Sequence, residues 1–239
     1  MRVFGLSLAA LALSALALRA EPVRDSAEFD LVMMGLTVGA VRFTGSQDGQ
    51  SYAVTGKLET TGLVAFLKQV SYDAESAGTV AGRKFVPQRY REKADTGERQ
   101  SEAVMEYIAG VPQVKAYNPP RPPRKTDVDP ASQGGTLDPL SALYAALRDA
   151  APGQECNLTV PMFDGRRASR LTLSAPQPAD DGGVTCSGEY RRVAGFTRKD
   201  MKKKTVFPFT LRYAPVDGRM RVVEVTMDTL YGQARMVRQ

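Results

Sequence analysis

Short runs of alternating apolar and polar residues, separated by tight-turn dipeptides, dominate this chain after its first twenty residues. Phe207, Phe209, Leu211 and Tyr213, for example, occupy every second position of one run. A period of two is typical of a β-strand whose two faces have different surroundings. The dipeptides that separate such runs are Asp48-Gly49, Ala81-Gly82, Ala109-Gly110, Asp164-Gly165, Asp181-Gly182 and Asp217-Gly218. Repeated short strands joined by tight turns predict an antiparallel meander.

Two segments have helical spacing instead. Residues 62–70 carry apolar side chains three and four positions apart and contain no proline. Asp138-Pro139 opens a clearer helix, because Asp is a good N-cap and Pro is favoured at the first helical position. Apolar residues then follow at i, i+3, i+4 and i+7 up to Pro152-Gly153. We therefore expect one or two short helices, the clearer one near residues 139–150.

Two further segments are rich in basic residues. Within residues 118–135, the four closely spaced prolines at 119, 120, 122 and 123 stand beside Arg121, Arg124 and Lys125, which excludes a central strand. We interpret this segment as a stiff surface loop, with peptide recognition as the alternative. The cluster from Arg198 to Lys204 is interpreted as a solvated hairpin tip, with contact to anionic lipid headgroups or another acidic surface as the alternative.

The N-terminus has the layout of a secretory signal peptide. Arg2 precedes an apolar run over residues 3–18, and small residues mark cleavage sites near Ala17 or Ala20. The alternative is a membrane anchor, but about 20 apolar residues are needed to span a bilayer. We expect residues 1–20 to be removed and residues 21–239 to form a single β-rich domain in the periplasm, without stable membrane insertion.

The two cysteines, Cys156 and Cys186, allow a single intramolecular pairing. Export places them where disulfides persist. A zinc site is disfavoured because the chain has no histidine, and a redox site is disfavoured because it has no C-x-x-C motif. We predict a structural disulfide that stabilises the fold by roughly 3–4 kcal/mol.

Composition argues against several classes of function. Removal of residues 1–20 takes away Arg2 and Arg19 and no acidic residue, so the formal net charge falls from +6 to +4. That balance is too weak for a nucleic-acid binder. The absence of histidine excludes Ser-His and Cys-His catalysis, and we find no nucleotide-binding motif. The close acidic pairs, Asp127/Asp129 and Asp180/Asp181, offer too few oxygens for calcium. We therefore expect no catalytic residues, no metal and no cofactor.

A curled sheet with few helices to cover its inner face can hold an apolar ligand. The alternative is that the apolar side chains on this inner face pack against one another into a solid core and leave no cavity. The residues that we expect to line such a cavity are Phe43, Tyr52, Leu63, Phe66, Phe163, Phe209 and Met227.

Eight short motifs occur in an order that resembles one exported family. They are Phe29-Asp30-Leu31, Gly35-Leu36-Thr37-Val38-Gly39, Thr61-Gly62-Leu63, Pro87-Gln88-Arg89-Tyr90, Asp138-Pro139-Leu140-Ser141-Ala142-Leu143, Phe163-Asp164-Gly165-Arg166-Arg167, Cys186-Ser187-Gly188 and Ala194-Gly195-Phe196. Together they resemble the proteobacterial family named domain of unknown function 3108. The resemblance implies a periplasmic protein of Gram-negative bacteria with no established activity. It also implies a curled sheet similar to that of periplasmic lipoprotein carriers and of envelope-integrity proteins built as a β-spiral. That family has no assigned catalytic residues, so none are carried over.

These observations together predict a mainly β protein, built on a strongly curved antiparallel sheet that forms a half-barrel or β-spiral. The function we expect is a non-enzymatic envelope protein that binds a lipid, a lipoprotein or another apolar molecule. The alternative is a structural module that binds an envelope protein partner. A hydrolase that uses distant carboxylates comes third.

Overall fold

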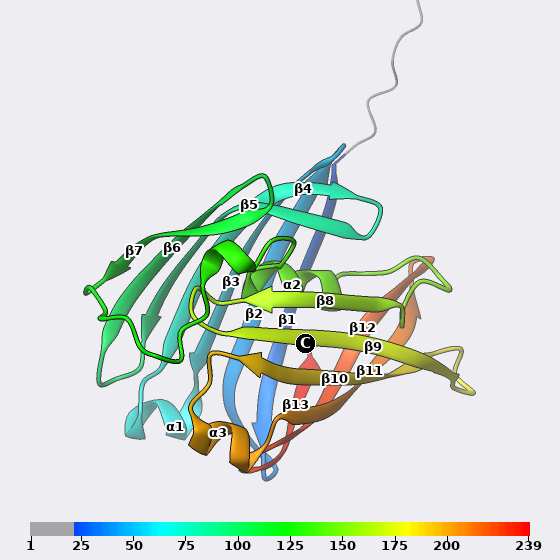
Figure 1. The fold of residues 1–239 in the computed structure, drawn as a ribbon. Helices are drawn as coiled ribbons and strands as arrows, with labels where there is room; N and C mark the ends of the chain where they lie inside the picture. The colour runs from blue at the N-terminus through cyan, green and yellow to red at the C-terminus, as the bar shows by residue number, and fades with distance from the viewer. Residues whose placement is uncertain (1–21) are drawn as a thin grey trace, which may run out of the picture.

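A computed structural model describes residues 22–239, except for the side chain of Leu63. Thirteen strands form one antiparallel sheet (Figure 1). The strands are β1 (Val23–Met33), β2 (Leu36–Asp48), β3 (Ser51–Thr60), β4 (Ser71–Ala81), β5 (Lys84–Asp95), β6 (Gln100–Ile108), β7 (Val111–Asn118), β8 (Leu158–Phe163), β9 (Ala168–Pro178), β10 (Val184–Ala194), β11 (Val206–Val216), β12 (Arg219–Thr229) and β13 (Gly232–Arg238). The helices are α1 (Gly62–Leu67), η1 (Pro130–Ser132), α2 (Pro139–Leu147) and α3 (Arg198–Lys203). The predicted mainly β class is confirmed.

The sheet consists of two meanders that meet at its centre. Strands β1 to β7 run in sequence order to one edge, and β13 back to β8 run to the other. The first and last strands join the two halves, with Phe29 opposite Arg238 and Met33 opposite Ala234. All six predicted turn dipeptides lie between consecutive paired strands, so the predicted meander is confirmed. The sheet curls strongly in Figure 1, but edges β7 and β8 do not pair with each other.

The chain between β7 and β8 covers the gap between these two edges. The N–H of Gly135 donates to the carbonyl of Gly110 in the β6–β7 turn. Leu137 then forms a parallel bridge with Met162 of β8. The Pro-rich segment is therefore an irregular surface connector, as the sequence predicts, and it supplies hydrogen bonds at edges that would otherwise be exposed.

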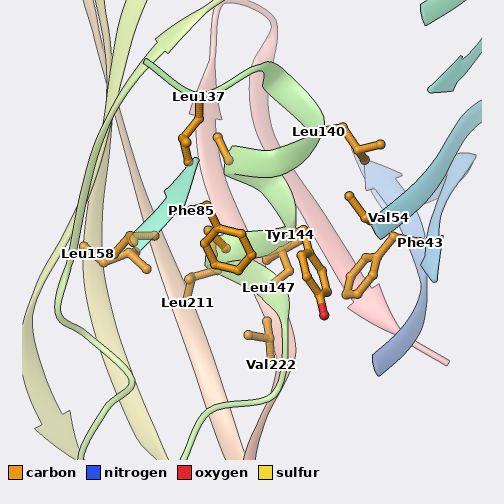
Figure 2. Close-up of a cluster of buried hydrophobic side chains, with 14 of the residues drawn as sticks. Phe43, Val54, Phe85, Leu137, Leu140, Tyr144, Leu147, Leu158, Leu211 and Val222 are labelled. Atoms are coloured by element: carbon orange, nitrogen blue, oxygen red, sulfur yellow. The ribbon is translucent and has the colours of Figure 1, made fainter. Parts of the chain in front are cut away.

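Helix α2 lies on the concave face of the sheet and forms the centre of the core (Figure 2). Tyr144 and Ala142 are fully buried, and the ring of Tyr144 packs edge-on against Phe43 and Phe85. The helix can come this close because β2 and β3 carry glycine beneath it. A β-carbon at Gly45 would lie 2.3 Å from the Tyr144 ring, and one at Gly56 would lie 2.5 Å from Leu140.

The helix predictions were right in kind and incomplete in extent. α2 begins at Pro139 as expected, and the Asp138 carboxylate accepts the N–H of Ser141 at 2.9 Å. It ends at Leu147, before the expected boundary, because Ala150 pairs as a bridge with Met220. Helix α3 was expected to be a hairpin tip, but Thr197 caps it by accepting the N–H of Asp200. Among residues 22–239 no helix is long and apolar enough to cross a bilayer.

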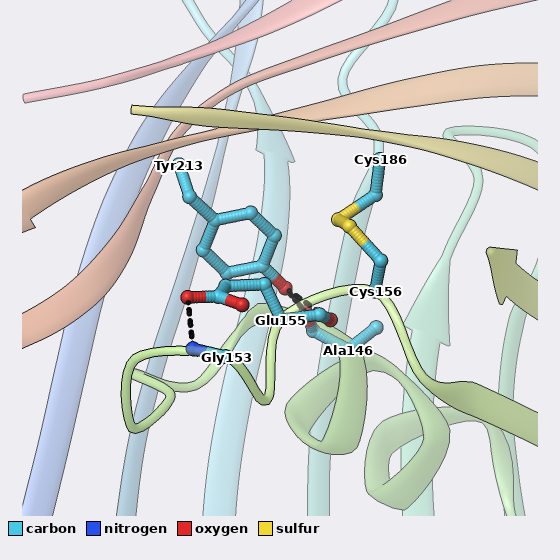
Figure 3. Close-up of a disulfide and its surroundings, with 6 residues drawn as sticks. All are labelled: Ala146, Gly153, Glu155, Cys156, Cys186 and Tyr213. Carbon is cyan, nitrogen blue, oxygen red and sulfur yellow. Dashed lines mark hydrogen bonds between the residues drawn. A yellow bond between two sulfur atoms is a disulfide. The ribbon is translucent and has the colours of Figure 1, made fainter. Parts of the chain in front are cut away.

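Cys156 and Cys186 form a disulfide with their Cα atoms 5.2 Å apart (Figure 3). The bond joins the loop after α2 to strand β10. Nearby, the Tyr213 hydroxyl donates to the carbonyl of Ala146 in α2 at 3.2 Å. The disulfide and this hydrogen bond therefore both attach the helical segment to the C-terminal half of the sheet.

Candidate functional site

The residues predicted to line an apolar cavity do not surround one in the described part of the chain. Phe43, Tyr52, Phe163 and Phe209 are buried members of the core that α2 fills. Met227 is half-buried at the margin of this core. For these residues the core-filling alternative is the correct one, because α2 occupies the concave face where a ligand would otherwise lie.

The two remaining predicted residues lie on α1. The Phe66 side chain is 91% exposed, so its inclusion in a cavity lining was wrong. The helix has only six residues and packs on the start of β2, with the N–H of Thr61 donating to the carbonyl of Val38. This leaves its apolar side at the rim of the sheet. The side chain of Leu63 lies outside the described part of the structure.

The core also contains a polar cluster beneath the start of α2. The Asp138 carboxylate is fully buried and accepts hydrogen bonds from the hydroxyls of Ser141 at 2.7 Å and Ser76 at 2.8 Å. The Tyr52 hydroxyl lies 2.7 Å from that of Ser141. Burial raises the pKa of Asp138, while these hydrogen bonds oppose the rise. Every member of the cluster has a partner, so we interpret it as the anchor of α2 and not as a reactive site.

A partly enclosed cleft of about 450 Å³ lies between the two halves of the curled sheet. One wall comes from the inner face of β4 to β7, and the other comes from the connector, the β8–β9 turn and the end of β10. Five arginines line it: Arg99, Arg121, Arg124, Arg166 and Arg167. Tyr72, Ala94, Ala103, Tyr117 and Pro139 contribute apolar surface.

Arg166 holds the connector against the β8–β9 turn. Its guanidinium donates twice to the Asp127 carboxylate, at 3.0 and 2.6 Å, and once to the carbonyl of Pro122 at 2.9 Å. The Arg166 side chain is only 11% exposed. A two-point arginine–carboxylate pair fixes orientation as well as distance, so this contact positions one wall of the cleft.

Three of the cleft arginines have a different environment. Among residues 22–239, Arg99, Arg121 and Arg124 form no ion pair with a carboxylate. Arg121 donates to the Ser101 hydroxyl at 3.2 Å, and its guanidinium lies 5.5 Å from the centre of the Tyr117 ring. Burial and then the positive charges of Arg99, Arg166 and Arg124 lower the pKa of Arg121. The cleft therefore has more arginines than carboxylates, and these three arginines have no carboxylate partner among the described residues, which favours binding of an anion.

The carboxylates of the cleft are already engaged. Glu92 accepts the Tyr90 hydroxyl at 2.7 Å, Glu102 is paired with Arg91, and Asp127 is paired with Arg166. One oxygen of Asp164 accepts the backbone N–H groups of Arg166 and Arg167 in the turn. Within residues 22–239, no group of three or more acidic or cysteine side chains is placed to hold a metal ion.

Several residues of this cleft belong to segments that are distinctive in the sequence, but nothing in the sequence links those segments to one another. Arg121 and Arg124 lie in the Pro-rich connector, and Arg166-Arg167 lie in a turn motif. Arg99 lies in the β5–β6 turn and carried no signal of its own. These positions come together only because the sheet curls and the connector crosses between its edges, and neither feature is local in sequence.

Comparison with known proteins places the chain in a family. No curated protein matches it. A similar solved structure is the beta-barrel-like protein of domain of unknown function DUF1849 from Brucella abortus, at 14% identity and a TM-score of 0.48, covering 93% of this chain and 97% of that one. The family model described as protein of unknown function (DUF3108) matches residues 28–177, which is more than half of the sequence. The chain therefore belongs to the DUF3108 family.

Proposed function

We propose that this protein is a non-enzymatic binding protein of the cell envelope, and that its arginine-lined cleft takes the anionic head of an envelope amphiphile. The observation that carries the proposal is the convergence of Arg99, Arg121 and Arg124 on the cleft without carboxylate partners among the described residues. Guanidinium groups bind phosphate and carboxylate oxygens through several directed hydrogen bonds. A phosphate or carboxylate group is therefore the chemistry that this cleft suits.

The walls of the cleft favour an amphiphile over a bare ion. Tyr72 and Tyr117 lie beside the arginines, and Ala94, Ala103 and Pro139 complete an apolar surface. The Tyr117 hydroxyl is buried and has no hydrogen-bond partner within the described residues. A ligand with both an anionic head and a less polar body would use both kinds of surface.

The proposal includes export and the absence of catalysis. Export is supported by the signal-like residues 1–20 and by the disulfide, a bond that persists in oxidising compartments. A non-catalytic role is supported by the engaged carboxylates, since hydrolysis by paired carboxylates needs two that are free to act on the substrate. The Asp127 carboxylate, for instance, has its pKa lowered by hydrogen bonds from Arg166.

Calorimetric titration with three soluble anions tests the proposal. Inorganic phosphate, glycerol 3-phosphate and short-chain phosphatidic acid separate a free phosphate from a lipid headgroup. We expect the short-chain lipid to bind best and added salt to weaken binding. Arg121→Gln should weaken it about tenfold or more, because a hydrogen bond to a charged group contributes roughly 1.5–3 kcal/mol.

Arg170→Gln is the matched control, because Arg170 is exposed on β9 and does not line the cleft. It should bind as the unchanged protein does. Equal affinity of the Arg121 and Arg170 variants would contradict the proposal, as would a preference for short-chain phosphatidylcholine over the anionic lipid.

A further inference from the structure

At one rim of the curled sheet, exposed apolar side chains lie together although they belong to elements far apart in the sequence. Met33 lies opposite Leu36 at the β1–β2 turn and opposite Ala234 near the β12–β13 turn, so these two turns are neighbours. α1 follows β3 and lies at the start of β2, where the N–H of Thr61 donates to the carbonyl of Val38. On the other side, the ammonium group of Lys204 at the end of α3 donates to the carbonyl of Asp228. Figure 1 shows α1, α3 and these turns at the same end of the sheet.

The exposed apolar side chains of the described residues are concentrated on this rim. The five largest exposed fractions belong to Phe66 at 91%, Leu67 at 88%, Met34 at 87%, Tyr231 at 81% and Leu36 at 65%. Single exposed apolar residues are ordinary on a protein surface. Their collection at one end, on turns and a short helix, indicates a surface that meets something apolar.

Helix α3 adds positive charge to the same rim. Arg198, Lys199, Lys202 and Lys203 are exposed, and none of them forms an ion pair with a carboxylate within residues 22–239. The helix also contains Asp200, whose carboxylate accepts the Thr197 hydroxyl at 2.6 Å. The rim therefore combines protruding apolar side chains with an excess of cations, which is the composition of interfacial membrane anchors.

We infer that this rim docks the protein on the surface of an anionic bilayer, with the tips at Met34, Phe66 and Tyr231 inserted at the headgroup boundary and α3 on the headgroups. The charges favour a bilayer over a second copy of the chain. A two-fold contact through this rim would bring the cations of one α3 toward those of the other, and like charges repel. A bilayer interface also accepts separate protruding side chains without a complementary groove.

The inference goes beyond the proposed function, since docking does not require the cleft to be occupied. The two surfaces are nevertheless close together. Arg99 of the cleft lies in the turn beside α1, where Lys68 and Glu98 pair at 3.2 Å. Gly195 of the cleft precedes α3 by three residues. Docking would therefore bring the cleft near the membrane surface.

A tryptophan reporter tests the docking directly, because the chain contains no tryptophan. The Phe66→Trp variant is purified from cells. It is then mixed with vesicles made of phosphatidylcholine alone or of phosphatidylcholine with phosphatidylglycerol. We expect a blue shift of the emission and quenching by brominated lipid only with the anionic vesicles, and reversal by salt. The matched reporter is Ile108→Trp, at a residue that is 62% exposed at the opposite end of β6. It should show neither effect.

Charge variants separate the two components of the rim. Lys199→Gln with Lys202→Gln should reduce vesicle binding of the Phe66→Trp reporter about tenfold or more. Lys84→Gln with Lys115→Gln removes two exposed cations elsewhere and should leave it unchanged. Arg121→Gln should also leave docking unchanged. An error in the proposal for the cleft and an error in the proposal for the rim would therefore give different experimental results.

Three outcomes would overturn the inference. One is an equal shift of the two tryptophan reporters. Another is equal binding to neutral and anionic vesicles. The third is a Phe66→Trp shift that appears without vesicles as protein concentration rises, which would assign the rim to self-association.

Discussion

The ring of Tyr144 lies against the backbone of Gly45, so close that a β-carbon at position 45 would be 2.3 Å from the ring. The Tyr144 hydroxyl also donates to the buried Asp25 carboxylate at 2.9 Å. The contact decides what the concave face of the sheet can hold. With glycine at 45 and 56, α2 rests directly on β2 and β3 and fills the space where an apolar ligand had been expected.

Gly45→Ala should therefore lower the free energy of unfolding by about 1–3 kcal/mol, because overpacking a core forces side chains and backbone to shift. Urea titration followed by circular dichroism measures the change. Gly134→Ala is the control, since its β-carbon would meet Val111 at an ordinary 3.5 Å. Equal stability of the two variants would show that α2 is not packed on Gly45.

The disulfide should contribute substantially to stability. It closes a loop over a sequence separation of 30 residues. Cys156→Ala with Cys186→Ala should lower the free energy of unfolding by about 3–4 kcal/mol in the chain-entropy model. A reducing agent should destabilise the unchanged protein and leave the double variant unaffected. Insensitivity of the unchanged protein to reduction would count against a stabilising role for the bond.

The buried Asp138 predicts a distinct dependence of stability on pH. Burial raises its pKa in the folded state, so folding is favoured most when the carboxyl is protonated. Its contribution is fully present below the unfolded pKa of about 4 and is lost as pH rises through the folded pKa. Asp138→Asn keeps a good helix cap and removes the charge. The stability of this variant relative to the unchanged protein should therefore increase from pH 4 toward pH 7.

Asp127 should show the opposite dependence of stability on pH. Hydrogen bonds from Arg166 lower its pKa, so its contribution is present above the unfolded pKa and is lost as pH falls through the folded pKa. Asp127→Asn should therefore lose more stability, relative to the unchanged protein, at pH 7 than at low pH. Parallel pH profiles for the two variants would contradict the assignment of Asp138.

Export predicts removal of the N-terminal residues. The mass of the intact protein recovered from the periplasmic fraction of a Gram-negative host should correspond to cleavage near Ala17 or Ala20. The two cysteines should be oxidised in that fraction. Recovery of the uncut chain in the cytoplasm alone would refute the interpretation of residues 1–20 as a signal.

Much of the fold could be predicted from local sequence patterns. The turn dipeptides and the Asp138-Pro139 helix start were readable because a tight turn or a helix cap depends on neighbouring residues. The pairing of β1 with β13 could not be predicted from such patterns, because Phe29 and Arg238 come from opposite ends of the chain. The alternation in a strand shows which residues share a face. It does not show whether a helix or a ligand will cover that face.

The candidate site was harder to predict for the same reason. The spacing of Phe66 in α1 is the same whether its face is buried or exposed, and the structure leaves it exposed. Arg99 and Arg121 belong to a turn and to a loop, where a basic residue is ordinary on a surface. Their convergence depends on the curl of the sheet. The Thr197 to Asp200 cap, by contrast, was a local signal for α3 that could have been read.

The central claim is that the arginine-lined cleft binds the anionic head of an envelope amphiphile. Mass spectrometry of the molecules that co-purify with the protein tests this claim most directly. The protein is purified from the periplasm without denaturation, extracted with organic solvent, and compared with Arg121→Gln and Arg170→Gln prepared in the same way. We predict an amphiphile with a phosphate or carboxylate head in the unchanged and Arg170 samples, and its depletion in the Arg121 sample. An uncharged lipid, or the same anionic lipid at equal amounts in all three samples, would contradict the assignment of the cleft.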